Sequence, residues 1–257
     1  MKRAKQISKV IVLLFATLII TSHSALALTD LSQDELINKG FNAYEKNPCS
    51  TTTTSDTFTT ANGKNNIQKA YNYFVDQGLT AAQAAGILGN LRQESGPNVN
   101  ESSHNTAARP SSVSPGSIIP GETWFGGGIA QWEDSNGVPG RWTGKNGFLS
   151  FVAGKGDFAG KPQGDGKTWK DINIQLNYIW WELNHTEKGA LAAVRTATTV
   201  KDATEKFERG YERAGKPVFE QRITYANEVY GWATAANAVA EAGTPPVPEH
   251  HRAAVRV

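Results

Sequence analysis

The pattern of apolar and polar residues predicts two consecutive helices at the start of a folded domain. The first covers residues 65–77, and its apolar residues recur at helical spacing, at Ile67, Tyr71, Phe74 and Val75. The second begins at Thr80, where Gln83 three residues later completes a capping-box pattern, and it ends at Gly96 and Pro97. The apolar face of this second helix consists of Ala84, Ile87, Leu88 and Leu91.

Residues 97–170 have a different character, because Gly, Ser, Pro and Asn dominate and no helical period continues through them. We expect short strands around Gly126–Trp132 within this region. A loop region of this length inside a compact domain is usually a binding region. Six of the seven tryptophans lie in it or just after it, namely Trp124, Trp132, Trp142, Trp169, Trp180 and Trp181.

Helical periodicity returns after residue 170 and predicts four further helices. Their apolar faces consist of Ile172, Leu176, Ile179, Trp180 and Leu183; of Leu191 and Val194; of Val200, Ala203, Phe207 and Tyr211; and of Phe219, Ile223, Ala226, Val229 and Tyr230. Residues 233–257 are alanine-rich and then proline-rich, and we expect them to form a disordered tail. The predicted fold class is therefore mainly α, an α+β arrangement with a long loop and short-strand region between helices.

The start of the chain resembles a secretory signal. Four basic residues precede an apolar stretch from Val10 to Ile20, which is too short to span a bilayer. A small-x-small pattern at Ala25–Ala27 follows, so residues 1–27 are expected to be removed and the mature chain to begin at Leu28. An uncleaved membrane anchor is the alternative. The expected location is outside the cell or at the cell wall, with no stable membrane insertion after cleavage.

Residues 28–62 are expected to precede the folded domain. Residues 31–44 could form a short amphipathic helix, whereas residues 47–62 are rich in Ser, Thr, Asn and Asp and read as a linker. Cys49 is the single cysteine, so the chain cannot form an internal disulfide, and the folded domain must be stabilised by the packing of its core. The domain itself is expected over residues 63–232.

Composition excludes several classes of function. The chain has 26 basic and 24 acidic residues, but the signal carries four basic and no acidic ones, which leaves 22 against 24. Nothing in this balance indicates a polycationic surface for nucleic acid. The five histidines show no spacing typical of metal ligands, so no metal and no cofactor is expected. A single cysteine in a linker, far from any histidine, argues against a papain-like amidase.

Glu94 is the candidate for acid chemistry. Ile87, Leu91 and Glu94 fall at i, i+4 and i+7 on one helical face, so the carboxyl points where the apolar residues point. It also lies in the last turn, at the negative end of the helix dipole. Both effects disfavour the anion, and a carboxylic acid that keeps its proton is what cleavage of a glycosidic bond requires. The alternative is an ordinary solvent-facing glutamate in a frayed last turn.

The motifs around Glu94 resemble the core of the phage tail lysozyme family, whose wider relatives are goose-type lysozymes and soluble lytic transglycosylases. The resemblance rests on Glu94-Ser95-Gly96, on Asn98 and Asn100, and on Gly128-Ile129-Ala130-Gln131-Trp132, in that order. The later segment Gly210–Gly215 is similar to the Tyr-Asn-Ala-Gly segment of these relatives, although Glu212 stands where they have Asn. The resemblance extends over residues 65–232.

The resemblance implies a lysozyme-like fold and cleavage of the β-1,4 bond between N-acetylmuramic acid and N-acetylglucosamine. Glu94 would be the general acid, with Ser95 beside it, while Gln131 and Trp132 would line the glycan cleft and Tyr211 would lie near the scissile sugar. An indole offers a flat apolar face to a sugar ring, although core packing is the alternative for Trp132. The expected partner is the glycan strand of peptidoglycan, bound by a monomer.

The identity of a second carboxylate stays open, because Glu101, Glu133 and Asp134 all lie near the expected cleft in sequence. A hydrolase normally uses a second carboxylate. A lytic transglycosylase of the same fold would need none, since the muramic acid 6-hydroxyl attacks instead. A catalytically inactive glycan-binding module is the other alternative.

Overall fold

The computed structural model describes residues 61–106, 113–135 and 138–243. The chain divides into two units, one formed by Tyr44–Tyr230 and the other by Met1–Ala43 together with Gly231–Val257. The expected signal peptide, almost all of the segment 28–62 and Cys49 lie outside the described residues. No helix within the described ranges is long and apolar enough to cross a membrane.

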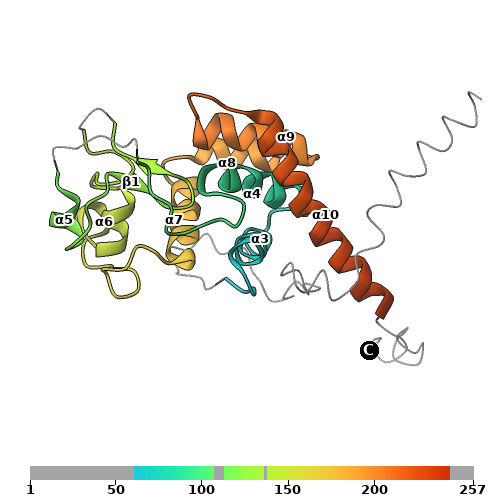
Figure 1. Ribbon diagram of the computed structural model, residues 1–257, viewed down its shortest axis with the longest axis horizontal. Helices are drawn as coiled ribbons and strands as arrows, with labels where there is room; N and C mark the ends of the chain where they lie inside the picture. The colour runs from blue at the N-terminus through green and yellow to red at the C-terminus, as the bar shows by residue number, and fades with distance from the viewer. Residues whose placement is uncertain (1–60, 107–112, 136–137, 244–257) are drawn as a thin grey trace, which may run out of the picture. The chain divides into compact units, whose positions relative to one another are not determined.

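The larger unit is mainly helical, as the sequence predicted (Figure 1). Each of the six helices predicted between residues 65 and 230 is present, whereas the short helix suggested for residues 31–44 lies outside the described residues. These helices are α3 (Asn66–Asp76), α4 (Ala81–Ser95), α7 (Ile172–Asn184), α8 (Lys188–Arg195), α9 (Val200–Phe207) and α10 (Phe219–Gly243). A five-residue π turn, η2 (Glu208–Glu212), follows α9 directly, so the segment predicted as one helix widens in its last turn.

Helix α4 is the central helix of this unit, and most of its residues are buried. The predicted capping box at its start is confirmed, because Thr80 and Gln83 bind each other's backbone N–H groups. Two glycines let neighbouring helices approach closely. A Cβ at Gly86 would lie 2.5 Å from the Cβ of Ala203 in α9, and a Cβ at Gly89 would meet α10. The positions of α9 and α10 therefore depend on these two small residues.

The segment between α4 and α7 contains short elements rather than loop alone. These are α5 (Pro115–Ile118), β1 (Gly126–Gly127), β2 (Trp132–Glu133), α6 (Phe148–Ala153) and the 3₁₀ turn η1 (Gly156–Phe158). The predicted strands form an antiparallel hairpin in which Gly126 pairs with Glu133 and Gly127 with Trp132. Helix α6 was not predicted, because six mostly apolar residues are too few to show a helical period.

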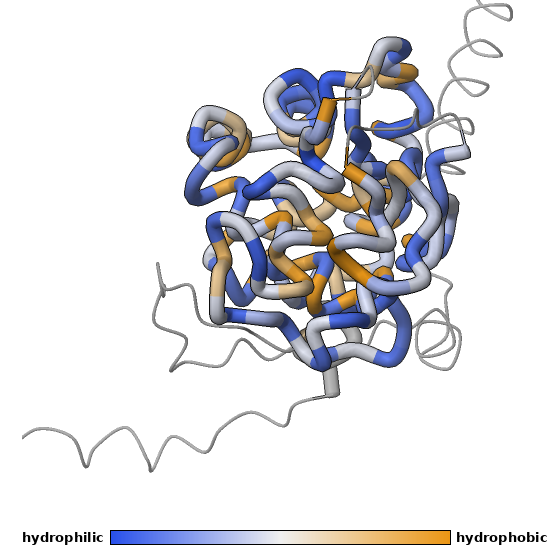
Figure 2. The backbone as a smooth tube through the Cα atoms, turned by 90° about the vertical axis from the view of Figure 1, so that its left-hand side faces the viewer, coloured by the Kyte–Doolittle hydropathy of each residue, from blue (hydrophilic) through white to orange (hydrophobic). Residues whose placement is uncertain are grey.

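Aromatic side chains give this segment a core of its own. The indole of Trp132 stacks on Phe148 with ring centroids 4.5 Å apart, and Tyr178 of α7 lies 5.2 Å from both rings. Trp142 is fully buried as well. In Figure 2 many of the hydrophobic, orange stretches of the backbone lie toward the middle of the fold, and hydrophilic, blue stretches are frequent at its periphery. Most tryptophans of the expected binding region therefore pack inside it.

The last helix, α10, continues to Gly243, beyond Ala233, where the sequence led us to expect the tail to begin. The reason is composition, because alanine has the highest helix propensity and this stretch is rich in it. Residues 244–257 lie outside the described part of the chain.

Candidate active site

Glu94 lies in the last turn of α4, at the edge of the core. Ile87 and Leu91, on the same face, are fully buried, whereas the Glu94 side chain keeps 20% of its surface exposed. Its Oε1 accepts a hydrogen bond of 2.5 Å from Nη2 of Arg222. The carboxyl is thus reachable from solvent on one side and held by a cation on the other.

Arg222, from the start of α10, is a partner of Glu94 that the sequence reasoning missed. Its side chain is 1% exposed, and it also donates to the Asn90 side chain at 3.2 Å and to the Pro217 carbonyl at 2.6 Å. These contacts fix the guanidinium in one position. Sequence reasoning considered only burial and the helix dipole at Glu94, whereas the structure adds a buried guanidinium in direct contact with the carboxyl.

A second buried carboxylate, Glu182 of α7, connects the hairpin to the later helices. Arg141 binds it in a bidentate pair, with Nε 2.8 Å from Oε1 and Nη2 2.9 Å from Oε2. The hydroxyl of Tyr211 donates to Oε2 at 2.5 Å, and the indole N–H of Trp132 donates to the same oxygen at 2.9 Å. Burial and the neighbouring charge of Glu182 raise the pKa of Tyr211, which keeps its proton for this bond.

A third carboxyl, Glu212, ends the π turn η2. Its Oε1 is buried and has no hydrogen-bond partner among the described residues. Burial raises the pKa of Glu212 well above its ordinary value, and the negative charge of Glu94 raises it further, while Arg141 and Arg222 act in the opposite direction. Sequence reasoning noted Glu212 only as a replacement for Asn.

The residues predicted to bind substrate occupy different environments. The Ser95 hydroxyl is buried and donates to the Leu91 carbonyl at 2.7 Å. Gln131 is half-buried, has a positive φ of 47°, and donates from its amide to the Ser103 hydroxyl at 2.9 Å. Trp132 and Tyr211 are brought together, 3.3 Å apart between Nε1 and the hydroxyl, but both are buried. Core packing accounts for the position of Trp132.

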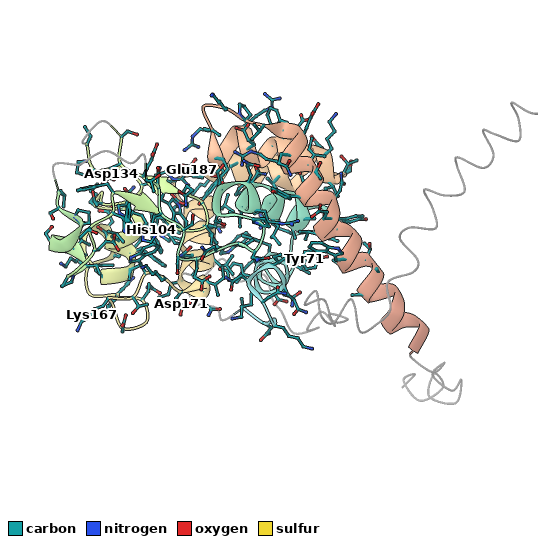
Figure 3. The ribbon with its side chains drawn as sticks, viewed as in Figure 1. Tyr71, His104, Asp134, Lys167, Asp171 and Glu187 are labelled. Atoms are coloured by element: carbon teal, nitrogen blue, oxygen red, sulfur yellow. The ribbon has the colours of Figure 1, made fainter. Side chains whose placement is uncertain are left out.

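The three acids considered as second carboxylates each bind neighbours of their own. Asp134 is buried and accepts from the backbone N–H groups of Gly140 and Thr143, so it holds the backbone around these two residues in place. Glu133 is exposed and accepts from the Asn105 amide at 2.6 Å. Glu101 accepts from the Asn66 amide. Figure 3 shows Asp134 beside the hairpin.

One tryptophan presents an exposed ring. Trp124 is 38% exposed and lies just before β1, and the ring of His104 stands 4.4 Å from its own, centroid to centroid. The Trp124 carbonyl accepts a hydrogen bond of 2.7 Å from the indole of Trp142, which anchors this segment to the core. Trp124 therefore offers the flat apolar surface that the sequence reasoning sought at Trp132. Within the described ranges, no group of His, Cys, Asp and Glu side chains is arranged to hold a metal ion.

The mainly helical fold, with a carboxyl at the end of a buried central helix and a glycine-rich hairpin after it, defines a lysozyme-like protein. Residues 65–232 match the family model described as phage tail lysozyme. The match covers more than half of the chain, so the chain belongs to the phage tail lysozyme family, and the predicted resemblance is confirmed. A search of curated proteins found no match. Family membership indicates a lytic enzyme of the glycosidase kind that acts on peptidoglycan.

Proposed function

We propose that this protein is a secreted peptidoglycan hydrolase that cleaves the β-1,4 bond between N-acetylmuramic acid and N-acetylglucosamine. In this proposal Glu94 is the general acid. The observation that carries it is the position of Glu94, partly exposed at the end of a buried helix and fixed by a buried arginine. The partner is the glycan strand of peptidoglycan, and the enzyme acts as a monomer outside the cell or at the cell wall.

The chemistry requires a proton for the leaving oxygen and a negative charge for the oxocarbenium-like transition state. An exposed edge of the Glu94 carboxyl lets a sugar oxygen approach within hydrogen-bond reach. The contact with Arg222 restricts the side chain to one orientation, which lowers the entropy that must be lost on reaching the transition state. Gln131 can donate to or accept from an acetamido group, and Trp124 can stack on a sugar ring.

The test is the activity of the mature protein on purified cell walls beside that of Glu94→Gln. Glutamine keeps the shape and an acceptor for Arg222 but has no proton to give, so we expect activity to fall at least ~10²-fold. The matched control is Glu220→Gln, which changes an exposed glutamate on α10 and should retain full activity. Wild-type-like activity of Glu94→Gln would remove Glu94 from the mechanism.

Thermal unfolding of the same variants separates chemistry from folding. Because Arg222 is buried and loses a charged acceptor, Glu94→Gln should lose about 1–2 kcal/mol of stability yet stay folded at 25 °C. An unfolded variant would assign Glu94 a structural role instead.

Product analysis decides between the alternatives. Mass spectrometry of the released fragments should show reducing N-acetylmuramic acid ends. A 1,6-anhydro end would assign the protein as a lytic transglycosylase, and cell-wall binding without any release would assign it as an inactive glycan-binding module.

A further inference from the structure

Gln175 is a fully buried side chain of α7 whose amide binds three backbone groups. Its Oε1 accepts from the N–H of Ile129 at 2.8 Å, and its Nε2 donates to the carbonyls of Glu101 at 2.8 Å and Trp169 at 3.0 Å. Because carbonyls only accept and an N–H only donates, a single orientation of the amide satisfies all three partners. Gln175 therefore joins three segments that are far from one another in sequence.

The first of these segments directly follows the candidate acid. Glu94 lies in the last turn of α4, and the chain then folds back, with the N–H of Asn100 donating to the carbonyl of Ser95 at 3.3 Å. Glu101, whose carbonyl binds the Gln175 amide, stands seven residues after Glu94. The hydrogen bond from Gln175 thus fixes the loop that leaves the end of α4.

The second segment is the glycine-rich turn that carries Gln131. Ile129, whose N–H binds Gln175, stands two residues before Gln131 and is fully buried. Gly128 leaves room for this contact, because a Cβ there would lie 3.1 Å from Oε1 of Gln175. The turn also binds the first segment directly, since Gly128 N–H and Gln131 Nε2 each donate to Ser103 at 2.9 Å. The turn and the loop after α4 therefore have Gln175 as a common support.

Helix α7 carries this support. It lies between α3 and α6 and contacts both of them (Figure 1). Gln175 and Glu182 are seven residues apart, about two helical turns, so their side chains leave the same face of α7. The indole of Trp132, at the far end of the glycine-rich turn, donates to Glu182 at 2.9 Å. Side chains of α7 thus hold the turn at both of its ends, at Ile129 and at Trp132.

We propose that Gln175 is a positioning residue, which holds the turn bearing Gln131 in the place relative to Glu94 that glycosidic bond cleavage requires. This inference rests on the proposed function of Glu94 as general acid. A general acid must stand within hydrogen-bond reach of the leaving oxygen, and a misplacement of about 1 Å can lower the rate ~10²-fold. Gln175 is buried and acts through the two backbone segments that it binds.

The chain contains a second buried glutamine with the same pattern of hydrogen bonds. Gln83, at the start of α4, accepts from the N–H of Thr80 at 3.0 Å through Oε1, and its Nε2 donates to two backbone carbonyls at the end of α8 and just after it, at 3.0 Å each. It stands eleven residues before Glu94, which is about 16 Å along the helix axis. Gln83 is therefore the matched control for Gln175.

The first test compares Gln175→Met with Gln83→Met. Methionine has a similar length and volume but forms none of the three hydrogen bonds, so both variants should lose stability by similar amounts in thermal unfolding. Cleavage of purified cell walls is then measured at a temperature at which both variants are folded. We expect kcat of Gln175→Met to fall ~10- to 10²-fold, because the turn shifts relative to Glu94, and Gln83→Met to keep the wild-type kcat.

A comparison of KM with kcat separates positioning from binding. Gln131→Ala removes a side chain that contacts the sugar in the proposed function, so it should mainly raise KM. Gln175→Met keeps that side chain and displaces the turn that carries it, so kcat should fall by a larger factor than KM rises. A dominant rise of KM in Gln175→Met would overturn the positioning role.

If Gln175→Met does not fold, Gln175→Glu gives the same information, with Gln83→Glu as its control. A buried, protonated glutamate keeps the acceptor for the N–H of Ile129 but has one donor where the amide has two, so one of the two carbonyls loses its partner. Equal kcat in the Gln175 and Gln83 variants of an active protein would overturn the positioning role alone. Absence of cleavage by the wild type would refute the proposed function itself.

Discussion

Gly89 should be the position where the packing of the helices can be tested most directly. A Cβ placed there would lie 2.6 Å from the Cβ of Ala226 and would also press on the backbone carbonyl of Arg222, both in α10. Neither a backbone oxygen nor an alanine methyl can rotate away. In Gly89→Ala, α10 must therefore retreat from α4 by about 1 Å to restore ordinary van der Waals distances.

Two opposing effects set the size of the change. Alanine gains about 1 kcal/mol over glycine from helix propensity, whereas overpacking against a helix that cannot yield costs up to about 3 kcal/mol. We expect a net loss of about 2 kcal/mol, which in a domain of this size lowers the unfolding midpoint by roughly 4–8 °C. Because Arg222 moves with α10, cell-wall cleavage should also fall, by as much as ~10²-fold.

Gly189 in α8 supplies the matched control, because a Cβ there meets nothing within 4 Å. Gly189→Ala should gain the helix propensity without the clash and stabilise the domain by about 0.5–1 kcal/mol. Both variants are measured by urea and thermal unfolding of the mature protein. If Gly89→Ala is stabilised as Gly189→Ala is, α4 and α10 do not approach each other as described, and the reasoning fails.

Two further predictions concern the sugar-binding surface and the start of the chain. Trp124→Ala should raise KM for cell-wall fragments about tenfold and leave kcat nearly unchanged, because the exposed ring stacks on sugar without taking part in the proton transfer; equal loss in kcat would contradict this. N-terminal sequencing of the secreted protein should begin at Leu28, and intact Met1 on membrane-bound protein would contradict the predicted cleavage.

The helices could be predicted because each buries a stripe of apolar residues that repeats at the helical period. The helical repeat also predicts that Glu94 lies on the same face of its helix as Ile87 and Leu91. Arg222 and Glu212 could not be assigned in this way, because they are more than a hundred residues from Glu94 in sequence. A charged residue among the apolar positions of α10, between Phe219 and Ile223, was the available signal.

The hairpin region shows where residue type misleads. An indole such as that of Trp132 is able to stack on a sugar ring. In the structure, however, the Trp132 N–H donates to Glu182 and its ring stacks on Phe148. The exposed ring belongs to Trp124, which has no distinguishing pattern around it. Sequence shows which side chains are able to bind a sugar, whereas exposure depends on contacts made across the whole domain.

The charges around Glu94 depend on the close packing of helices against α4. Because Gly86 has no side chain, α9 can pack closely against α4, and the π turn that follows α9 ends at Glu212. In the same way Gly89 allows the close approach of α10, which carries Arg222. The attraction between two charges falls with distance and rises as water is excluded, so a small residue at Gly89 strengthens the Glu94–Arg222 ion pair without bearing any charge. Gly89 in particular sets how closely the arginine of α10 can approach the carboxyl at the end of α4.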